Sequence, residues 1–251
     1  MDRGNAYQAL VENAQKHYRA QSGDASFLVS LDDAFGGCRE INLYTYWQGR
    51  GYAETTPGIK YLLVGQDWGN PFSTPSSFQD RIKKIISGED LPYITDEHNI
   101  DSGFQTDINV IALFRQLGYE IVRERYSELF FTNFCLGYRR GKNSGNMTET
   151  LMSKDRESFQ KLCELLKPQH ILCLGEKTFR CVYAALVKDP VTLYKDGYLR
   201  YIESRPEVHA DAGYGSGRIF PLVHCGVHGL LNRSLDWQRT DWEWVRRESM
   251  R

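Results

Sequence analysis

Long apolar stretches are missing from this sequence of 251 residues. No run approaches the roughly 18 consecutive apolar residues of a membrane-spanning helix, and the first residues, Met1 to Tyr7, contain no apolar signal region. The net charge is only −1, which argues against a protein that coats nucleic acid by bulk charge but is compatible with a local basic groove. We therefore expect a cytoplasmic protein with no membrane partner.

Closely spaced cysteine pairs are missing too. The six cysteines include no C-x-x-C spacing, so the usual signature of a zinc or iron–sulfur site is absent. Most of them stand in apolar segments, which predicts buried free thiols. The sequence also has no internal repeat, linker or low-complexity tract. We expect one domain over residues 1–251, with residues 1–58 as a helical and irregular N-terminal extension packed on it.

Alternating strand and helix patterns fill the rest of the chain. Buried strands are predicted at residues 60–64, 128–135, 170–174 and 219–224. Helices are predicted at residues 5–20, 106–117, 153–167, 176–188 and 237–247. This alternation predicts an α/β three-layer sandwich, with a central, mostly parallel sheet of four to five strands flanked by helices. We expect a strand or edge segment at 198–202 and a surface loop at 206–217.

Polar side chains stand where three of these strands end. Gln66 and Asp67 follow the first strand, Asn133 lies in the second and His224 ends the fourth. Because the carboxyl ends of parallel strands share one edge, where open α/β sheets bind ligands, these groups are expected to gather there. Each also has a structural interpretation: Asp67 as a cap, Asn133 as a partner of a loop backbone, and His224 as a satisfied core histidine. Their joint placement favours a functional site.

The same segments resemble the uracil-DNA glycosylase superfamily, in order and spacing, over residues 60–235. Family-one members carry Gly-Gln-Asp-Pro-Tyr-His after the first core strand, and Gly65 to Asn70 here read Gly-Gln-Asp-Trp-Gly-Asn. A strand of the type Leu-Leu-Leu-Asn corresponds to Phe130 to Asn133, followed by a basic loop. The last family strand ends in His-Pro-Ser-Pro, and Val223 to His228 stand in that place.

The resemblance implies base flipping and hydrolysis of an N-glycosidic bond, with no metal or other cofactor. Asp67 matches the carboxylate that orients water and stabilises the sugar cation, and His224 matches the imidazole that donates to the base O2. Asn133 matches the amide that reads the pairing edge of the base, and Gln66 lines the base pocket. The aromatic residue that stacks on the base is expected to be Phe78 or, second, Phe72.

The implied partner is DNA that carries a uracil-type or mismatched base. Leu230 or Leu231 is expected to insert between bases as an apolar wedge. The basic residues that flank the proposed site are expected to contact the DNA backbone; they are Arg139, Arg140, Lys142 and Arg233.

Two departures from the family pattern leave alternatives open. Gly69 stands where the family has the tyrosine that blocks a thymine methyl group, and Cys225 to His228 replace the Pro-Ser-Pro-Leu segment. The alternatives are a non-catalytic member of the fold that binds nucleic acid or protein, and a nucleotide- or nucleoside-processing enzyme. Retention of Asp67, Asn133 and His224 together favours the enzyme.

Two further chemistries are weakly indicated near the last strand. His224, His228 and His209 suggest a zinc site if residues 224–228 are helical, but Gly226 and Gly229 argue against a helix there. Cys225 could act as a nucleophile beside His224, but neighbours on a strand point to opposite faces. We expect neither.

Overall fold

A mixed, mostly parallel sheet of five strands forms the centre of the protein in the computed structural model. The model describes residues 3–20, 28–29, 48, 58–67, 105–122, 124–135, 138–139, 147–187, 193–210 and 217–251. The strand order is β3-β2-β5-β7-β6. The parallel strands are β2 (Tyr61–Gly65), β3 (Leu129–Asn133), β5 (His170–Leu174) and β7 (Gly217–Leu222). The edge strand β6 (His209–Ala210) runs antiparallel to β7.

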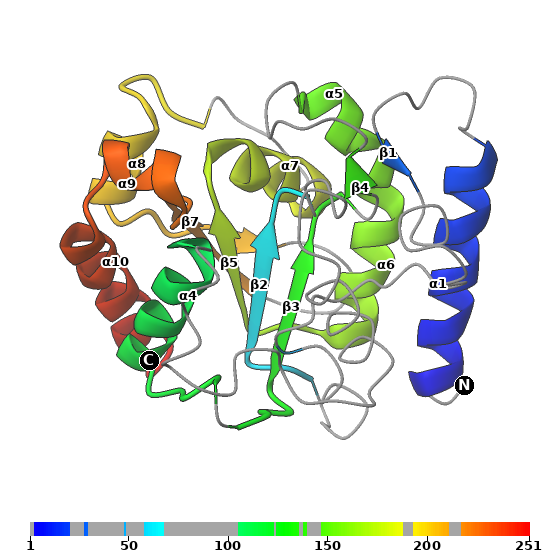
Figure 1. The fold of residues 1–251 in the computed structure, drawn as a ribbon, viewed down its shortest axis with the longest axis horizontal. Coiled ribbons are helices and arrows are strands. Elements are labelled where there is room, and N and C mark those ends of the chain that lie inside the picture. Colours follow the sequence, from blue (N-terminus) through cyan, green and yellow to red (C-terminus); the bar gives the residue numbers. More distant parts are fainter. Residues whose placement is uncertain are drawn as a thin grey trace.

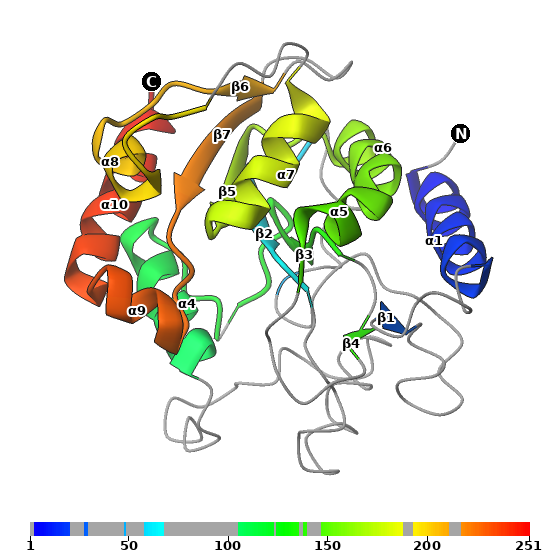
Figure 2. The same cartoon turned by 90° about the horizontal axis from the view of Figure 1, so that it is seen from above.

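Helices cover both faces of this sheet (Figures 1 and 2). Successive strand residues point to opposite faces, so Leu63 packs with Trp242 on one side and Val64 packs with Phe179 on the other. The two apolar clusters make three layers, as the sequence predicts. The helices on the first face are α4 (Gln105–Gln116) and α10 (Leu235–Glu248), and those on the second are α6 (Arg156–Leu166) and α7 (Glu176–Leu186).

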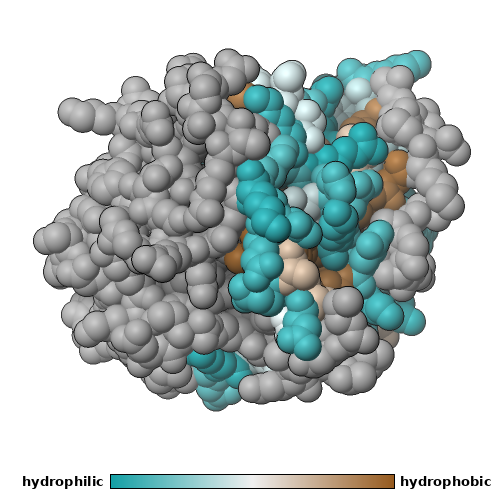
Figure 3. All heavy atoms as spheres, turned by 90° about the vertical axis from the view of Figure 1, so that its right-hand side faces the viewer, coloured by the Kyte–Doolittle hydropathy of each residue, from teal (hydrophilic) through white to brown (hydrophobic). Residues whose placement is uncertain are grey.

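The N-terminal helix α1 (Arg3–Ala20) lies outside α6 (Figure 1). Its buried residues are those of the predicted apolar stripe, namely Tyr7, Leu10, Val11 and Ala14. They join the core cluster that contains α6, so the predicted helix at residues 5–20 is confirmed. On the side of the molecule where α1 lies, most of the described surface is hydrophilic (Figure 3).

Three sequence predictions for the last third of the chain are wrong. Residues 198–202 belong to a helix, α8 (Tyr198–Glu203), because Tyr198 and Ile202 are four apart and are both buried on one face. The predicted loop at 206–217 contains β6, which pairs with the start of β7. A short helix, α9 (Val227–Asn232), follows the last strand despite Gly226 and Gly229.

The remaining elements are short. β1 (Leu28–Val29) pairs antiparallel with β4 (Tyr138–Arg139) in a separate two-stranded sheet. A helical turn, α5 (Glu149–Met152), and a 3₁₀ turn, η4 (Ser153–Asp155), lead into α6. Within the described ranges, no helix is long and apolar enough to cross a membrane.

The chain order around the central strands defines where a site can form. From β2 the chain passes to β3 on one side, whereas from β5 it passes to β7 on the other. The direction of winding thus reverses between β2 and β5, and open α/β sheets place ligands at the carboxyl ends of strands at such a point. The arrowheads in Figure 1 mark this edge.

Candidate functional site

Asn133 and Gly65 form the first part of the site, at the carboxyl ends of β3 and β2. The two residues are partners in the parallel ladder. A Cβ on Gly65 would stand 2.3 Å from Asn133 Oδ1, so only glycine lets this amide lie across the end of β2. Asn133 is 9% exposed. The site therefore holds a nearly buried amide in a position set by a glycine.

Gln66 and Asp67 continue directly from β2. The backbone carbonyls of Gly65 and Gln66 accept hydrogen bonds from the N–H groups of Phe134 and Cys135, at 2.9 and 3.0 Å. This prolongs the contact between the two chain segments beyond the strands. Gln66 Nε2 donates to Asp67 Oδ2 at 2.8 Å. Asp67 is partly buried, so its carboxylate is held in place while keeping some exposed surface.

His224 follows β7 on the same edge. Its Nδ1 atom accepts a hydrogen bond from the Gly226 N–H at 3.0 Å. Burial lowers the pKa of His224, the charge of Asp67 raises it, and His228 lowers it; the net pKa lies below the ordinary value of 6.5. Because Nδ1 acts as an acceptor, the neutral ring carries its proton on Nε2.

Two glycines allow the turn after His224. A Cβ on Gly226 would lie 2.6 Å from Thr106 Oγ1 and 2.9 Å from His224 Cε1. A Cβ on Gly229 would overlap the His224 carbonyl oxygen, at 1.5 Å. The glycines that argue against a helix in the sequence are therefore required for α9 to start so close to the histidine.

The first turns of α4 hold the same loop from the other side. Asn109 Nδ2 donates to the Cys225 carbonyl at 2.5 Å, and Cys225 Sγ lies 3.6 Å from the Thr106 carbonyl as a donor. Gln105 Nε2 donates to Asn109 Oδ1 at 3.1 Å. Sequence reasoning missed these residues. The available signal was a polar residue, Asn109, on the apolar stripe of a predicted helix; it is 1% exposed.

Asp67, Asn133 and His224 all lie at the carboxyl edge of the sheet, but they follow or end three different strands. β3 and β7 are separated by β2 and β5, so with about 4.8 Å between strands the backbones of Asn133 and His224 stand roughly 14 Å apart. Asp67 extends from β2, between them. An edge of this width, with an amide at one end, a neutral imidazole at the other and a carboxylate between, can bind a planar polar ring and stabilise a cation beside it.

Several predicted residues lie outside the described part of the chain. They are Phe72, Phe78, Arg140 and Lys142. The backbone of Arg139 lies in β4, opposite Leu28 of β1. Its assignment as a DNA contact stays a prediction.

Leu230 and Leu231 lie on α9, directly after the His224 loop. Leu230 is partly buried, whereas Leu231 is 80% exposed. Val227, one helical turn before Leu231, is 60% exposed. An apolar face of α9 is therefore open to solvent near the candidate site, and Leu231 is the better placed of the two predicted wedge residues.

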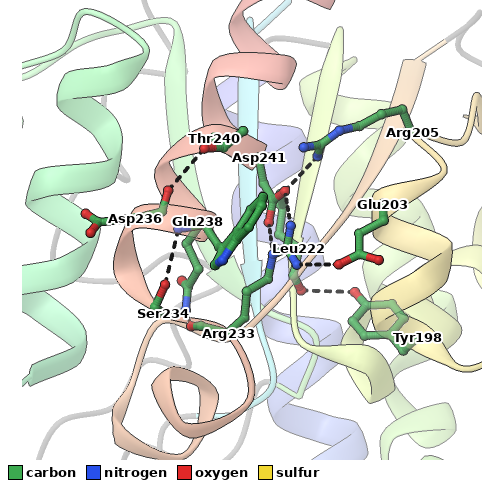
Figure 4. Close-up of polar contacts among 11 residues, drawn as sticks. Tyr198, Glu203, Arg205, Leu222, Arg233, Ser234, Asp236, Gln238, Thr240 and Asp241 are labelled. Atoms are coloured by element: carbon green, nitrogen blue, oxygen red, sulfur yellow. Dashed lines mark hydrogen bonds and ion pairs between the residues drawn. The ribbon is translucent and has the colours of Figure 1, made fainter.

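Arg233 does not fit its predicted role as a DNA contact. Its side chain is 5% exposed, and its Nε and Nη2 atoms donate to the two carboxylate oxygens of Asp241 at 2.6 and 2.9 Å. Nη1 also pairs with Glu203 at 3.1 Å (Figure 4). A guanidinium that is buried and bound to two carboxylates is not accessible to a DNA phosphate, so the structure does not support Arg233 as a DNA contact.

The two weaker chemistries near His224 gain no support. Nowhere in the described ranges do three or more His, Cys, Asp or Glu side chains form a group that could hold a metal ion. Cys225 is fully buried, and burial followed by the charge of Asp107 raises the pKa of its thiol to about 12. The thiolate is the reactive form, so a raised pKa disfavours Cys225 as a nucleophile.

Other cysteines are buried free thiols, as the sequence predicts. They are Cys135, Cys163, Cys173 and Cys181, while Cys38 lies outside the described residues.

Comparison of the chain with models of known protein families, and with curated proteins, gives no match. The resemblance to uracil-DNA glycosylases therefore rests on the sequence segments quoted above.

Proposed function

We propose that this protein is a DNA glycosylase that flips a uracil-type base and hydrolyses its N-glycosidic bond. The observation that carries the proposal is the placement of His224. Its Nδ1 atom accepts a hydrogen bond from the Gly226 N–H at 3.0 Å, and it follows β7 on the sheet edge where Asp67 follows β2 and Asn133 ends β3.

His224 is suited to assist the leaving group. A fixed neutral ring has one N–H left to donate, on Nε2. Directed at the O2 atom of a departing pyrimidine, this donor would stabilise the negative charge that develops as the bond between the base and the sugar breaks. Because the pKa of His224 is lowered, the ring can act in this form at neutral pH without first losing a proton.

Asp67 is suited to stabilise the other fragment. When the bond between C1′ and the base breaks, its electron pair leaves with the base and the sugar becomes cationic. A carboxylate beside C1′ stabilises that cation and accepts a proton from the water that attacks it. The base then takes up a proton, so the products are a free base and an abasic sugar. Gln66 holds one carboxylate oxygen through its side-chain amide.

Asn133 is suited to select the base. Its side chain offers one acceptor and two donors, which match the N–H and C=O groups on the pairing edge of uracil. Burial strengthens the selection, because a base with the wrong edge would leave the amide without partners. Leu231 on the exposed face of α9 is suited to fill the space that the flipped base leaves in the duplex.

Release of base from oligonucleotides tests this proposal. The substrates carry one uracil opposite guanine, opposite adenine, or in a single strand, and abasic sites are revealed by alkaline cleavage. We expect cleavage by the wild-type protein, and a loss on the order of 10²–10⁴-fold for His224→Ala. The matched control is His209→Ala, since His209 is a half-exposed histidine on β6, away from the carboxyl ends.

Each other result has a definite meaning. Cleavage that His224→Ala leaves unchanged contradicts the assigned role. No cleavage, together with tight and salt-sensitive binding to the same oligonucleotides, would replace the enzyme with a non-catalytic nucleic-acid binder. Neither cleavage nor binding would overturn the proposal altogether.

A further inference from the structure

The opposite, amino-terminal edge of the sheet holds a cavity of about 530 Å³. Arg218, near the start of β7, is paired in the ladder with His170 at the start of β5. It stands six residues before His224, or roughly 20 Å along an extended strand. The charged residues that line the cavity are Arg205, Arg218, Arg247, Arg251, Glu207 and Glu248. They come from β7, from the end of α10 and from the segment between α8 and β6.

Positive charge is in excess around Glu248. Its carboxylate pairs with Arg218 and, at 2.9 Å, with Arg251. No ion pair joins Arg247 to another described residue. The cavity lining thus sets the guanidinium groups of Arg218, Arg247 and Arg251 against the one carboxylate of Glu248, an excess of two positive charges. Glu207 lies at the margin, 69% exposed and bonded to His209, where solvent screens its charge.

The pKa values of neighbouring groups report the same field. Burial raises the pKa of Glu248, but the hydrogen bond and charge of Arg218, with Arg251, lower it below its ordinary value. Burial, with smaller contributions from the charges of Lys60 and Arg218, lowers the pKa of His170 to about 4. The positive charges of Arg218, Arg251 and Lys60 thus act on both residues in the direction that nearby positive charge requires.

Arg218 is held in place with a donor unused. Its side chain is 15% exposed, and its guanidinium lies 5.1 Å from the centre of the Phe220 ring. The Nε atom is buried and has no hydrogen-bond partner among the described residues. Buried donors are nearly always paired, so this N–H is an unsatisfied donor of a residue that lines the cavity.

Arg205 is fixed on the other side of the cavity. Nη1 donates to Asp241 at 2.7 Å, as Figure 4 shows, and the guanidinium lies 5.1 Å from the centre of the Trp244 ring. Arg205 and Arg218, each held by a carboxylate and an aromatic ring, therefore surround the same space as Arg247 on the last turn of α10 and Arg251 just beyond it. Side chains that are already held in place lose little conformational entropy when a ligand binds.

We propose that this cavity binds the phosphate group of a small phosphorylated molecule. A phosphate monoester carries about −1.5 to −2 charges at neutral pH, which matches the excess of two, whereas a single carboxylate carries one. Guanidinium forks bind phosphate oxygens in pairs. The volume falls within the roughly 300–1,000 Å³ usual for small-molecule sites. The site is separate from the carboxyl edge, so the proposal does not depend on glycosylase activity.

Calorimetric titration of the full chain tests it, with inorganic phosphate, pyrophosphate and uridine monophosphate as ligands and acetate as the carboxylate. Ionic strength is held constant with sodium chloride. We expect binding of the phosphate compounds only, weakened about tenfold in Arg247→Gln, which removes one guanidinium fork. Arg246→Gln is the matched control: it removes the same charge from the same exposed turn of α10, outside the cavity. Asp67→Asn should bind inorganic phosphate and pyrophosphate as wild type, because Asp67 follows β2 at the opposite edge of the sheet.

Three results would overturn the proposal. The first is absence of binding by all three phosphate compounds. The second is equal weakening in Arg247→Gln and Arg246→Gln, which would reduce the effect to net charge. The third is binding of an oligonucleotide that depends on Arg247 while the small phosphates do not bind, which would assign this edge to nucleic acid. Circular dichroism of each variant verifies that it is folded.

Discussion

The two edges of the central sheet use polar residues in different ways. At the carboxyl edge, close contacts with Gly65, Gly226 and Gly229 place the Asn133 amide and the His224 imidazole, and the Gln66 side chain holds the Asp67 carboxylate. At the amino edge, the polar groups are mostly charged, and ion pairs hold them, as between Glu248 and Arg218. The first arrangement presents groups of different chemistry to a ligand, whereas the second concentrates one sign of charge.

Substitutions at close glycine contacts and at buried ion pairs are expected to affect the protein differently. A methyl group added at Gly65 meets a side-chain atom, Asn133 Oδ1, so it changes the geometry of the site before it changes stability. An ion pair that loses one member leaves a buried charge, so it changes stability first. Variants at the two kinds of position therefore separate function from folding.

The largest effect on stability is expected from Asp241→Ala. It leaves Arg233 buried without the carboxylate that accepts two of its hydrogen bonds, and it also removes the partner of Arg205. Loss of one member of a buried pair costs about 3–5 kcal/mol, which urea denaturation will measure. Asp236→Ala is the control. The Asp236 side chain pairs with Arg239 but is 87% exposed, so we expect the free energy of unfolding to change by no more than about 0.5 kcal/mol. Equal losses would contradict the assignment.

The next effect compares two glycines at opposite ends of β2. In Gly58→Ala the new Cβ would lie 2.6 Å from the Lys167 backbone carbonyl, so we expect destabilisation by about 1–3 kcal/mol and an unchanged rate of base release per folded molecule. In Gly65→Ala it would displace the side-chain amide of Asn133, so the rate should fall at least about tenfold, or 1.4 kcal/mol, with little change in stability. A Gly65→Ala variant of full activity would remove Asn133 from the site.

A smaller effect is expected from acid. The pKa of His170 is about 4 in the folded protein, against 6.5 ordinarily. As pH falls from 6.5 towards 4, the unfolded chain therefore binds a proton that the folded protein does not, and the free energy of unfolding decreases. Above pH 6.5 the residue contributes no pH dependence. In His170→Gln the decrease should be shallower, while His209→Gln, at a half-exposed position, should follow the wild type.

The smallest expected effect is a flat region in the pH profile of the rate. If neutral His224 is the working form, its lowered pKa means that base release shows no transition at pH 6.5. Single-turnover rates between about pH 5.5 and 8 measure this. A transition at 6.5 that disappears in His224→Gln would indicate that the ring must lose a proton to act.

Much of the fold is predictable from the sequence, because hydrophobic periodicity records burial directly. The strands near residues 61, 129, 170 and 217 and the helices between them are confirmed to within two residues at most ends. The helix α8 was mistaken for a strand because a six-residue segment holds too few turns to display a period. The helix α9 was missed because glycine disfavours helices in general. Here Gly229 is required by its close contact with the His224 backbone, and helix propensity does not account for such contacts.

Part of the candidate site was also predictable from the sequence, and part of it was not. Gln66, Asp67, Asn133 and His224 could be placed at one edge because strand ends in a parallel sheet coincide. The support from Thr106 and Asn109 could not, since it depends on how α4 packs against the loop. Arg233 was misassigned because its nearness in sequence to the site says nothing of Asp241.

The rate of uracil release by Asp67→Asn from a single-stranded oligonucleotide tests the central claim most directly. Arg247→Gln, at the amino edge, and Asp236→Asn, on the exposed side of α10, are measured beside it. The account predicts a loss on the order of 10²-fold or more for Asp67→Asn, with both other variants close to wild type. Wild-type activity that Asp67→Asn retains, or that Arg247→Gln loses equally, would contradict a catalytic site at the carboxyl edge.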